Sequence, residues 1–271
     1  MINLDDTLYP SNTGLGEACK TNIDDFLVEK CGFPESKASS LRVELFKSYG
    51  STLAGLRALG YDIDADDYHS VVHGRLPYDR IKPDPQLRNL LRSIAQRKII
   101  FTNSDRKHAV KALDRLGVRD CFEQIICFET MNPNLPSSTR PNEFPVVLKP
   151  SMEAMEIALR VAEVDPRRTL FLDDNIRNVA AGKAVGLRTV LQPLKWFLAR
   201  NKELKWGGKS WKNRESNEAD EADYVLENVN NLAQAVSEVW VGGKDGGNKR
   251  ISRTRSDIEV DSILTTTAVG A

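Results

Sequence analysis

The sequence has no excess of charge of either sign. Its 271 residues contain 38 lysines and arginines against 38 aspartates and glutamates, so the formal net charge is zero at pH 7. Proteins that hold nucleic acids or anionic membranes usually present a strong positive field, and this chain as a whole has none. We therefore predict neither a nucleic-acid partner nor a membrane partner.

Long apolar runs are missing, and cysteine is scarce. No stretch approaches the roughly 20 apolar residues of a membrane-spanning helix, and the acidic start is unlike a secretory signal. Cys19, Cys31, Cys121 and Cys127 form no CxxC pair and have no histidine at metal spacing, which favours separate thiols in a reducing compartment. We predict a soluble cytoplasmic protein, although an organelle address could have preceded the first residue.

Histidine is also rare, with three in the chain. His69 and His73 have the i, i+4 spacing of a metal-binding pair on a helix, but no third ligand is evident in the sequence. We expect these two side chains to lie on the surface of a helical region or to pack within it.

The chain has two successive regions with different patterns of apolar residues. Apolar residues recur at helical spacing from about residue 14 to residue 95, with Ser51 and the pair Asp84–Pro85 at typical helix starts. Short apolar runs then alternate with helices: "KIIF", "EQIICFE", "TLFL" and "LRTVLQ". This alternation predicts right-handed βαβ units and an α/β fold with a parallel sheet.

The domain organisation follows from these two patterns. We predict an α/β core made of residues 1–13 and 84–241, with a helical block, residues 14–83, inserted into it. Residues 242–271 are rich in Gly, Ser and Thr with mixed charge, and we predict a disordered tail. The basic, Trp-bearing stretch near residues 195–220 has no sustained period and is interpreted as a linker or surface flap.

Polar residues end several of the expected strands. They are Asn3, Asp5 and Asp6 in "NLDDT", Thr102 and Asn103 after "KIIF", and Asp173 and Asp174 after "TLFL", with Lys149 in "VVLKP" between the last two groups. The carboxyl ends of parallel strands face one crevice, where ligands bind. Carboxylates, a hydroxyl, an amide and one lysine at such a crevice suit Mg²⁺-assisted phosphoryl transfer, because hard oxygens bind Mg²⁺ and the lysine neutralises phosphate.

The four motifs together resemble those of the haloacid dehalogenase superfamily. "NLDDTLY", "FTNSD", "LKPS" and "FLDDN" stand in the order of that superfamily, and "LDDTLYP", "HGRLPYD" and "DDNIRNVAAGKAVGLRTVL" are similar to its pyrimidine 5′-nucleotidase-like branch of plants and fungi. The resemblance runs from residue 3 to about residue 192, with weaker support to about 240. It implies a Rossmann-like core with an inserted α-helical cap of the C1 type.

The resemblance also implies roles for single residues. In the superfamily an aspartate attacks phosphorus to form an aspartyl-phosphate, and an acid two residues later serves as general acid and base. The implied catalytic residues here are Asn3, Asp5 and Lys149; the phosphate-binding residues are Thr102, Asn103 and Lys149; and the Mg²⁺ ligands are Asn3, Asp5, Asp173 and Asp174. Taken alone, Asp174 and the pair Ser104–Asp105 also fit helix N-caps, and a lysine before proline fits a solvated loop.

Asn3 departs from the pattern of the family. A neutral amide should not displace an alkoxide from phosphorus, and loss of a nucleophile costs on the order of 10⁶ in kcat in a well-studied protease. Only Met1 and Ile2 precede Asn3, whereas a central strand usually has about five or six residues. Both features suggest an alternative start, a splice form or a mistaken gene model; a designed inactivation and an evolved pseudoenzyme remain open.

The sequence thus predicts a Mg²⁺-dependent phosphomonoester hydrolase whose turnover is in doubt at Asn3. The resemblance implies a small phosphorylated metabolite as substrate, with a pyrimidine nucleoside 5′-monophosphate as the best single choice. The alternative is a catalytically impaired isoform that binds Mg²⁺ and a phosphorylated ligand, or a protein partner, without turnover.

Overall fold

The computed structural model describes residues 1–135, 145–192, 222–226 and 228–236. The predicted tail at 242–271 and the segment near 195–220 lie outside these residues. The helices in chain order are α1 (Leu15–Glu29), α2 (Glu35–Tyr49), α3 (Thr52–Ala58), α4 (Ala65–Val72), α5 (Pro85–Ser93), α6 (Arg106–Leu116), α7 (Phe128–Met131), α8 (Met152–Ala162), α9 (Ile176–Ala184) and α11 (Leu232–Ala235). The strands are β1 (Ile99–Phe101), β2 (Gln124–Ile126), β3 (Leu170–Asp173), β4 (Arg188–Leu191) and β5 (Tyr224–Val225).

All the strand pairs in the described residues are parallel. β1 pairs with β2, and β4 lies between β3 and β5. The N-terminal segment joins these two groups, because Ile2 forms parallel bridges to Ile100 on one side and to Leu172 on the other. The resulting spatial order is β2, β1, the segment at Ile2, β3, β4, β5, which places the first residues of the chain in the middle of the sheet.

The N-terminal segment is short but fully paired. Ile2 donates its N–H to Ile99 O at 2.8 Å, and Asn3 donates its N–H to Leu172 O at 2.8 Å. Phe101 N–H donates to Ile2 O at 2.9 Å in return. The segment therefore delivers Asn3 to the carboxyl edge of the sheet although it is an isolated bridge rather than a full strand.

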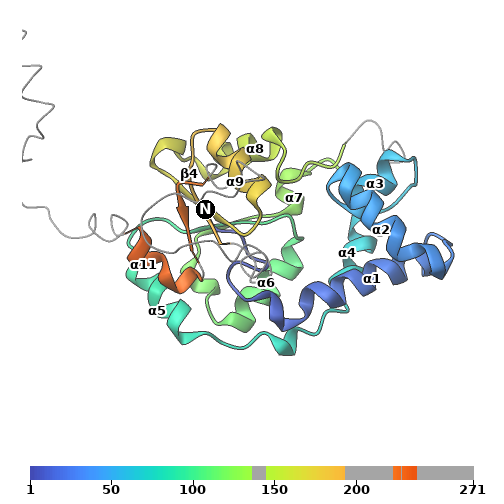
Figure 1. The fold of residues 1–271 in the computed structure, drawn as a ribbon, viewed down its shortest axis with the longest axis horizontal. Coiled ribbons are helices and arrows are strands. Elements are labelled where there is room, and N and C mark those ends of the chain that lie inside the picture. The colour runs from blue at the N-terminus through green and yellow to red at the C-terminus, as the bar shows by residue number, and fades with distance from the viewer. Residues whose placement is uncertain (136–144, 193–221, 227, 237–271) are drawn as a thin grey trace, which may run out of the picture.

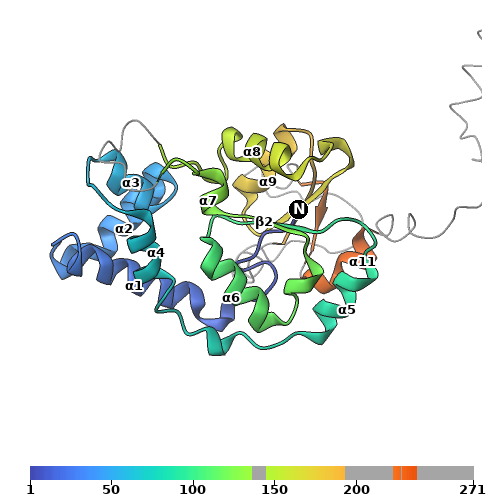
Figure 2. The same cartoon turned by 180° about the vertical axis from the view of Figure 1, so that it is seen from behind.

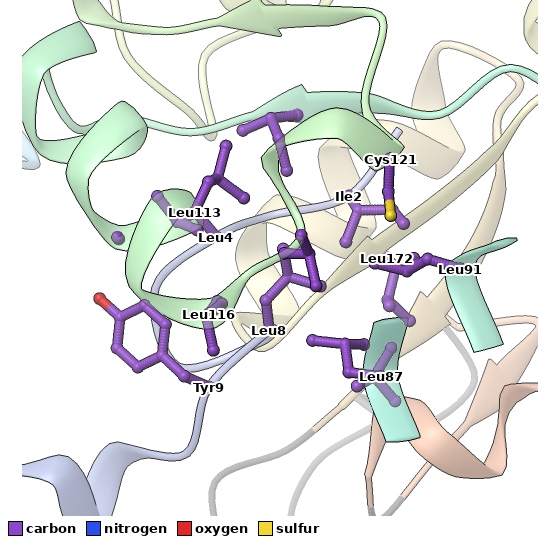
Figure 3. Close-up of a cluster of buried hydrophobic side chains, with 14 of the residues drawn as sticks. Ile2, Leu4, Leu8, Tyr9, Leu87, Leu91, Leu113, Leu116, Cys121 and Leu172 are labelled. Atoms are coloured by element: carbon purple, nitrogen blue, oxygen red, sulfur yellow. The ribbon is translucent and has the colours of Figure 1, made fainter. Parts of the chain in front are cut away.

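Both faces of the sheet are buried, as expected when helices cover a parallel sheet. On one face Ile2, Leu4 and Leu172 pack with residues of α5 and α6 (Figure 3). On the other face Met1 and Phe171 pack with residues of α8. Met1 and Ile2 point to opposite faces because side chains alternate along a strand.

Helices α1 to α4 form a separate helical layer beside the sheet (Figures 1 and 2). Their buried residues, among them Phe26, Leu56 and Tyr68, make a third apolar cluster that also takes in Phe128 of α7. Together with the parallel sheet, this confirms the predicted α/β fold with a Rossmann-like core and an inserted helical cap. The predicted domain boundaries stay a prediction.

No helix within the described part of the chain is long and apolar enough to cross a membrane.

Candidate active site

The loop after Ile2 turns sharply at the edge of the sheet. Leu8 donates its N–H to Leu4 O at 2.9 Å, and Asp6 has a φ of 57° in the left-handed region, where a non-glycine residue is uncommon. Leu4 and Leu8 are buried in the core, which anchors the turn. The turn places the side chains of Asn3, Asp5 and Thr7 at the carboxyl ends of β1 and β3.

Lys149 lies at the bottom of the site, almost without solvent exposure. Its Nζ donates to Asp173 Oδ2 at 2.7 Å, to Asn3 Oδ1 at 3.0 Å and to Phe101 O at 2.8 Å. The side chains of Lys149 and Asp173 are 1% and 0% exposed. A buried lysine with all three protons committed is a fixed positive charge, not the solvated loop residue that the sequence left as an alternative.

Asn3 connects Lys149 to the acidic part of the site. Its Oδ1 accepts from Lys149, while its Nδ2 donates to Asp174 Oδ1 at 2.8 Å, to Asp5 O at 2.9 Å and to Thr7 Oγ1 at 3.1 Å. Asn3 is only 8% exposed. The structure thus brings Asn3, Asp5, Lys149, Asp173 and Asp174 together, as the order of the motifs predicted.

The two aspartates at the end of β3 face different neighbours. Asp173 Oδ2 accepts a hydrogen bond from Lys149. Its Oδ1 accepts from Asn175 N–H and from Asn178 Nδ2, each at 2.9 Å. Asp174 accepts from Asn3 and, at 3.2 Å, from Thr7 Oγ1. Asn175, not Asp174, caps α9, so the carboxylate of Asp174 is free to face the site.

The carboxylate of Asp5 accepts hydrogen bonds from four side chains. Tyr9 OH and His108 Nε2 contact Oδ1, the latter at 2.6 Å, and Ser104 Oγ and Thr102 Oγ1 donate to Oδ2 at 2.7 and 3.4 Å. Burial would raise the pKa of Asp5, but the charge of His108 and these donors hold it well below its ordinary value. Asp5 is therefore an ionised carboxylate in the free site, and its side chain is still 35% exposed to solvent.

Two other carboxyls titrate in the opposite direction. Burial and the charge of Asp5 raise the pKa of Asp6 to about 6. Burial and the charges of Asp173 and Asp6 raise the pKa of Asp174 to about 7. Burial is the main cause of both shifts and like charges add to it, a combination that is common where a protein gathers carboxylates for a cation or for acid–base chemistry.

Thr102 and Asn103, predicted to bind phosphate, both lie at the site. Thr102 Oγ1 accepts the N–H of Ser104 at 3.1 Å and donates to Asp5. Asn103 pairs with the main chain of Lys149 through both ends of its amide, donating to Lys149 O at 3.0 Å and accepting from Lys149 N–H at 2.9 Å. Asn103 thus holds the backbone that carries Lys149.

The helical cap reaches the site through histidines. His73 Nδ1, just after α4, forms an ion pair with Asp105, the N-cap of α6. The ring of His73 lies 4.7 Å from that of His108 and 5.4 Å from that of His69, between ring centroids. His69 is buried, so the expected packing role holds for it, while His73 joins cap and core instead of lying on the surface.

Sequence reasoning missed three residues around Asp5. Tyr9, Ser104 and His108 all donate to this carboxylate, yet none was predicted to act at the site. Tyr9 and Ser104 adjoin motif residues, which is a weak signal. His108, three residues after the N-cap of α6, gives no sequence signal, because its contact with Asp5 depends on how α6 packs against the N-terminal loop.

The oxygen atoms expected to bind a divalent cation already have other hydrogen-bond partners. Of the expected oxygens, Asp5 O and Asp174 Oδ1 already accept from Asn3 Nδ2, and both oxygens of Asp173 are committed elsewhere. Among the described residues, no group of three or more His, Cys, Asp or Glu side chains could hold a metal ion. With Asn3 in this orientation the residues present do not fit Mg²⁺.

Comparison with known proteins decides the family. The model of haloacid dehalogenase-like hydrolases matches residues 4–186, more than half of the chain. The chain belongs to the haloacid dehalogenase-like hydrolase family. This match confirms the superfamily that the order of the four motifs indicated.

Two relatives illustrate the match. "Phosphate metabolism protein 8" of Saccharomyces cerevisiae (strain ATCC 204508 / S288c) is 27% identical over 199 residues, which are 70% of this chain but 60% of that protein. The crystal structure of CbbY from Rhodobacter sphaeroides in complex with phosphate superposes with a TM-score of 0.53 at 17% identity, covering 85% of this chain and 94% of that one. The latter similarity shows the fold.

Proposed function

We propose that this chain carries a phosphomonoesterase site that binds a small phosphorylated metabolite and is slowed at Asn3. The observation that carries the proposal is the fixed charge of Lys149, whose Nζ lies 3.0 Å from Asn3 Oδ1. A buried lysine beside the position of the nucleophile is suited to neutralise a transferring phosphoryl group. Asp5 stands next to it, partly exposed, at the place for proton transfer.

The reaction proposed for a chain with aspartate at position 3 runs through an aspartyl-phosphate. The carboxylate would attack phosphorus and form the O–P bond while the bond to the leaving alkoxide breaks. Asp5, ionised in the free site, would pass a proton from His108 Nε2 to the alkoxide and would then take one from the water that hydrolyses the aspartyl-phosphate. Thr102 would donate to a phosphate oxygen, and Asn103 would keep Lys149 in place.

Asn3 changes this reaction at its first step. Its amide oxygen accepts from Lys149, and its lone pairs are delocalised into the C–N bond, so it is a poor nucleophile. A second function, binding without turnover, is favoured by the same observation, since Lys149, Thr102 and Asp5 stay in position. Hydrolysis and binding without turnover would use the same site, and they differ only in whether the residue at position 3 attacks phosphorus.

The substrate class is proposed from the resemblance. The cap selects the leaving group, and the wording of the motifs favours a pyrimidine nucleoside 5′-monophosphate. Similarity to a protein named for phosphate metabolism supports a phosphorylated substrate. Mg²⁺ belongs to the same proposal only for a chain with a carboxylate at position 3, and a cytoplasmic location stays a prediction.

Calorimetric titration with UMP and with uridine tests the binding function. We expect UMP to bind at least about tenfold more tightly, because each hydrogen bond to a charged group contributes about 1.5–3 kcal/mol. Thr102→Val should weaken UMP and leave uridine unchanged. Thr189→Val, which removes another buried hydroxyl, one that hydrogen-bonds Asp223 and none of the proposed site residues, is the matched control. Equal affinities for UMP and uridine would refute the proposal.

A further inference from the structure

The amide of Asn3 has two chemically different ends, and each is committed. Oδ1 can only accept, and it accepts a hydrogen bond from Lys149 Nζ at 3.0 Å. Nδ2 can only donate, and it lies 2.9 Å from Asp5 O and 2.8 Å from Asp174 Oδ1. Its remaining contact, Thr7 Oγ1 at 3.1 Å, in turn donates to Asp174. The nitrogen therefore sits between the two oxygens that the family would offer to a cation.

Lys149 fixes the orientation of this amide. The ammonium has three protons and three acceptors, namely Phe101 O, Asp173 Oδ2 and Asn3 Oδ1, and its side chain is 1% exposed. A flipped Asn3 would turn its NH₂ group toward the ammonium and leave one buried N–H of Lys149 without an acceptor. Unsatisfied buried donors on charged groups are strongly disfavoured, so the observed orientation prevails.

A carboxylate at position 3 would meet no such conflict. Both of its oxygens accept, so one could stay with Lys149 while the other faced Asp5 O and Asp174. Three oxygens would then surround one point, an arrangement that a hard divalent cation binds well and that is repulsive without one. With asparagine, two N–H groups meet the same two oxygens and no cation is needed.

We propose that Asn3 is a built-in replacement for the divalent cation. Its Nδ2 group holds Asp5 O and Asp174 Oδ1 together, so the site of this chain is complete without Mg²⁺ and has lost the affinity for Mg²⁺ that a carboxylate at position 3 would give. The substitution removes the nucleophile and the metal site in one step. This inference concerns the cation and holds whichever phosphomonoester the site takes.

Mn²⁺ is the probe for the test, because its free form is counted directly by electron paramagnetic resonance. The wild-type chain and Asn3→Asp are titrated with Mn²⁺ alone, without any phosphate ester. We expect Asn3→Asp to bind Mn²⁺ at least about tenfold more tightly, since ligand charge sets affinity at oxygen sites. Equal affinity of the two proteins would overturn the proposal.

Thermal unfolding gives a second readout that is independent of activity. The Tm of the wild-type chain should be the same in EDTA and in Mg²⁺. The Tm of Asn3→Asp should fall in EDTA and recover in Mg²⁺, because binding to the native state stabilises it. Asn22→Asp is the matched control, since Asn22 is also 8% exposed but lies in the cap with its Nδ2 on Val72 O. A clear Mg²⁺-dependent rise in the Tm of the wild-type chain would contradict the inference without recourse to any variant.

Discussion

His108 Nε2 lies 2.6 Å from Asp5 Oδ1, while the other ring nitrogen of His108 lies 2.8 Å from the hydroxyl of Tyr78. The imidazole is 3% exposed and joins the proposed acid–base residue to the segment that leads from the cap back to the core. Burial would lower the pKa of His108, but the charge and hydrogen bond of Asp5, together with the charge of Asp105, outweigh it and raise the pKa. His108 is thus a positioning residue for Asp5.

The first prediction concerns this pair. In the Asn3→Asp background, His108→Gln should lower kcat about tenfold with little change in KM, a fraction of the 10²- to 10⁴-fold that acid–base catalysis supplies. The reason is that Asp5 loses a donor that fixes its orientation, while phosphate binding by Lys149 is untouched. His69→Gln, a change in another buried histidine that packs on Phe128, should leave kcat unchanged. An equal loss in both variants would show a structural effect only.

The second prediction is a pH dependence of stability from Asp105 and His73. Burial would raise the pKa of Asp105, but the hydrogen bond and charge of His73 lower it to about 2. Burial would lower the pKa of His73, but Asp105 and the thiol of Cys19 raise it, against the charge of His108. His69, stacked beside it, has its own pKa lowered to about 4, chiefly by burial.

The signs define the pH window. A depressed carboxyl pKa stabilises the native state above the ordinary value near 3.8 and loses this effect as pH falls toward 2; a raised histidine pKa stabilises below about 6.5 and loses it as pH rises. Asp105→Asn keeps the N-cap but removes the charge, so it should cost about 2 kcal/mol between pH 4 and 6 and less on either side. Chemical denaturation at several pH values measures this. Asp64→Asn, a similar change at the exposed cap of α4, should show no such window.

The third prediction concerns the packing that holds β3 in place. A Cβ added to Gly182 in α9 would lie 2.6 Å from Phe171 Cδ1, a buried ring atom of β3. Gly182→Ala should therefore destabilise the protein by about 1–3 kcal/mol through overpacking. Gly16→Ala, exposed in α1 with nothing within 4 Å, should instead stabilise it slightly. Urea unfolding of both variants checks the contrast; stabilisation by both would mean that α9 shifts freely on the sheet.

The sequence predicted the elements well where a local rule decides them. The runs "KIIF" and "TLFL" became β1 and β3, and Ser51, Asp84 and Asp105 cap their helices as expected from side-chain chemistry. These outcomes depend on neighbours in the chain, so periodicity and capping rules reach them. The alternative N-cap role of Asp174 does not hold, because Asn175 is the N-cap of α9 and accepts the N–H of Arg177.

The site was only partly within reach of the sequence. The order of the motifs predicted that Asn3, Lys149 and Asp173 lie at one site, but nothing in "FLDD" indicates which of its two aspartates faces the lysine. That choice is made by the alternation of β3, which turns Asp173 inward to Lys149 and leaves Asp174 to Asn3. The contact between His108 and Asp5 spans 103 positions and depends on helix packing, so no local pattern predicts it.

The measurement that tests the central claim most directly is the rate of phosphate release from UMP in the presence of Mg²⁺, for the wild-type chain and for Asn3→Asp. The two proteins differ only at position 3, where the amide NH₂ group of asparagine is replaced by a carboxylate oxygen. We predict that Asn3→Asp releases phosphate and that the wild-type rate is lower by several orders of magnitude, up to roughly 10⁶. Equal rates in the two proteins would mean that the nucleophile is another group and that Asn3 does not control this site.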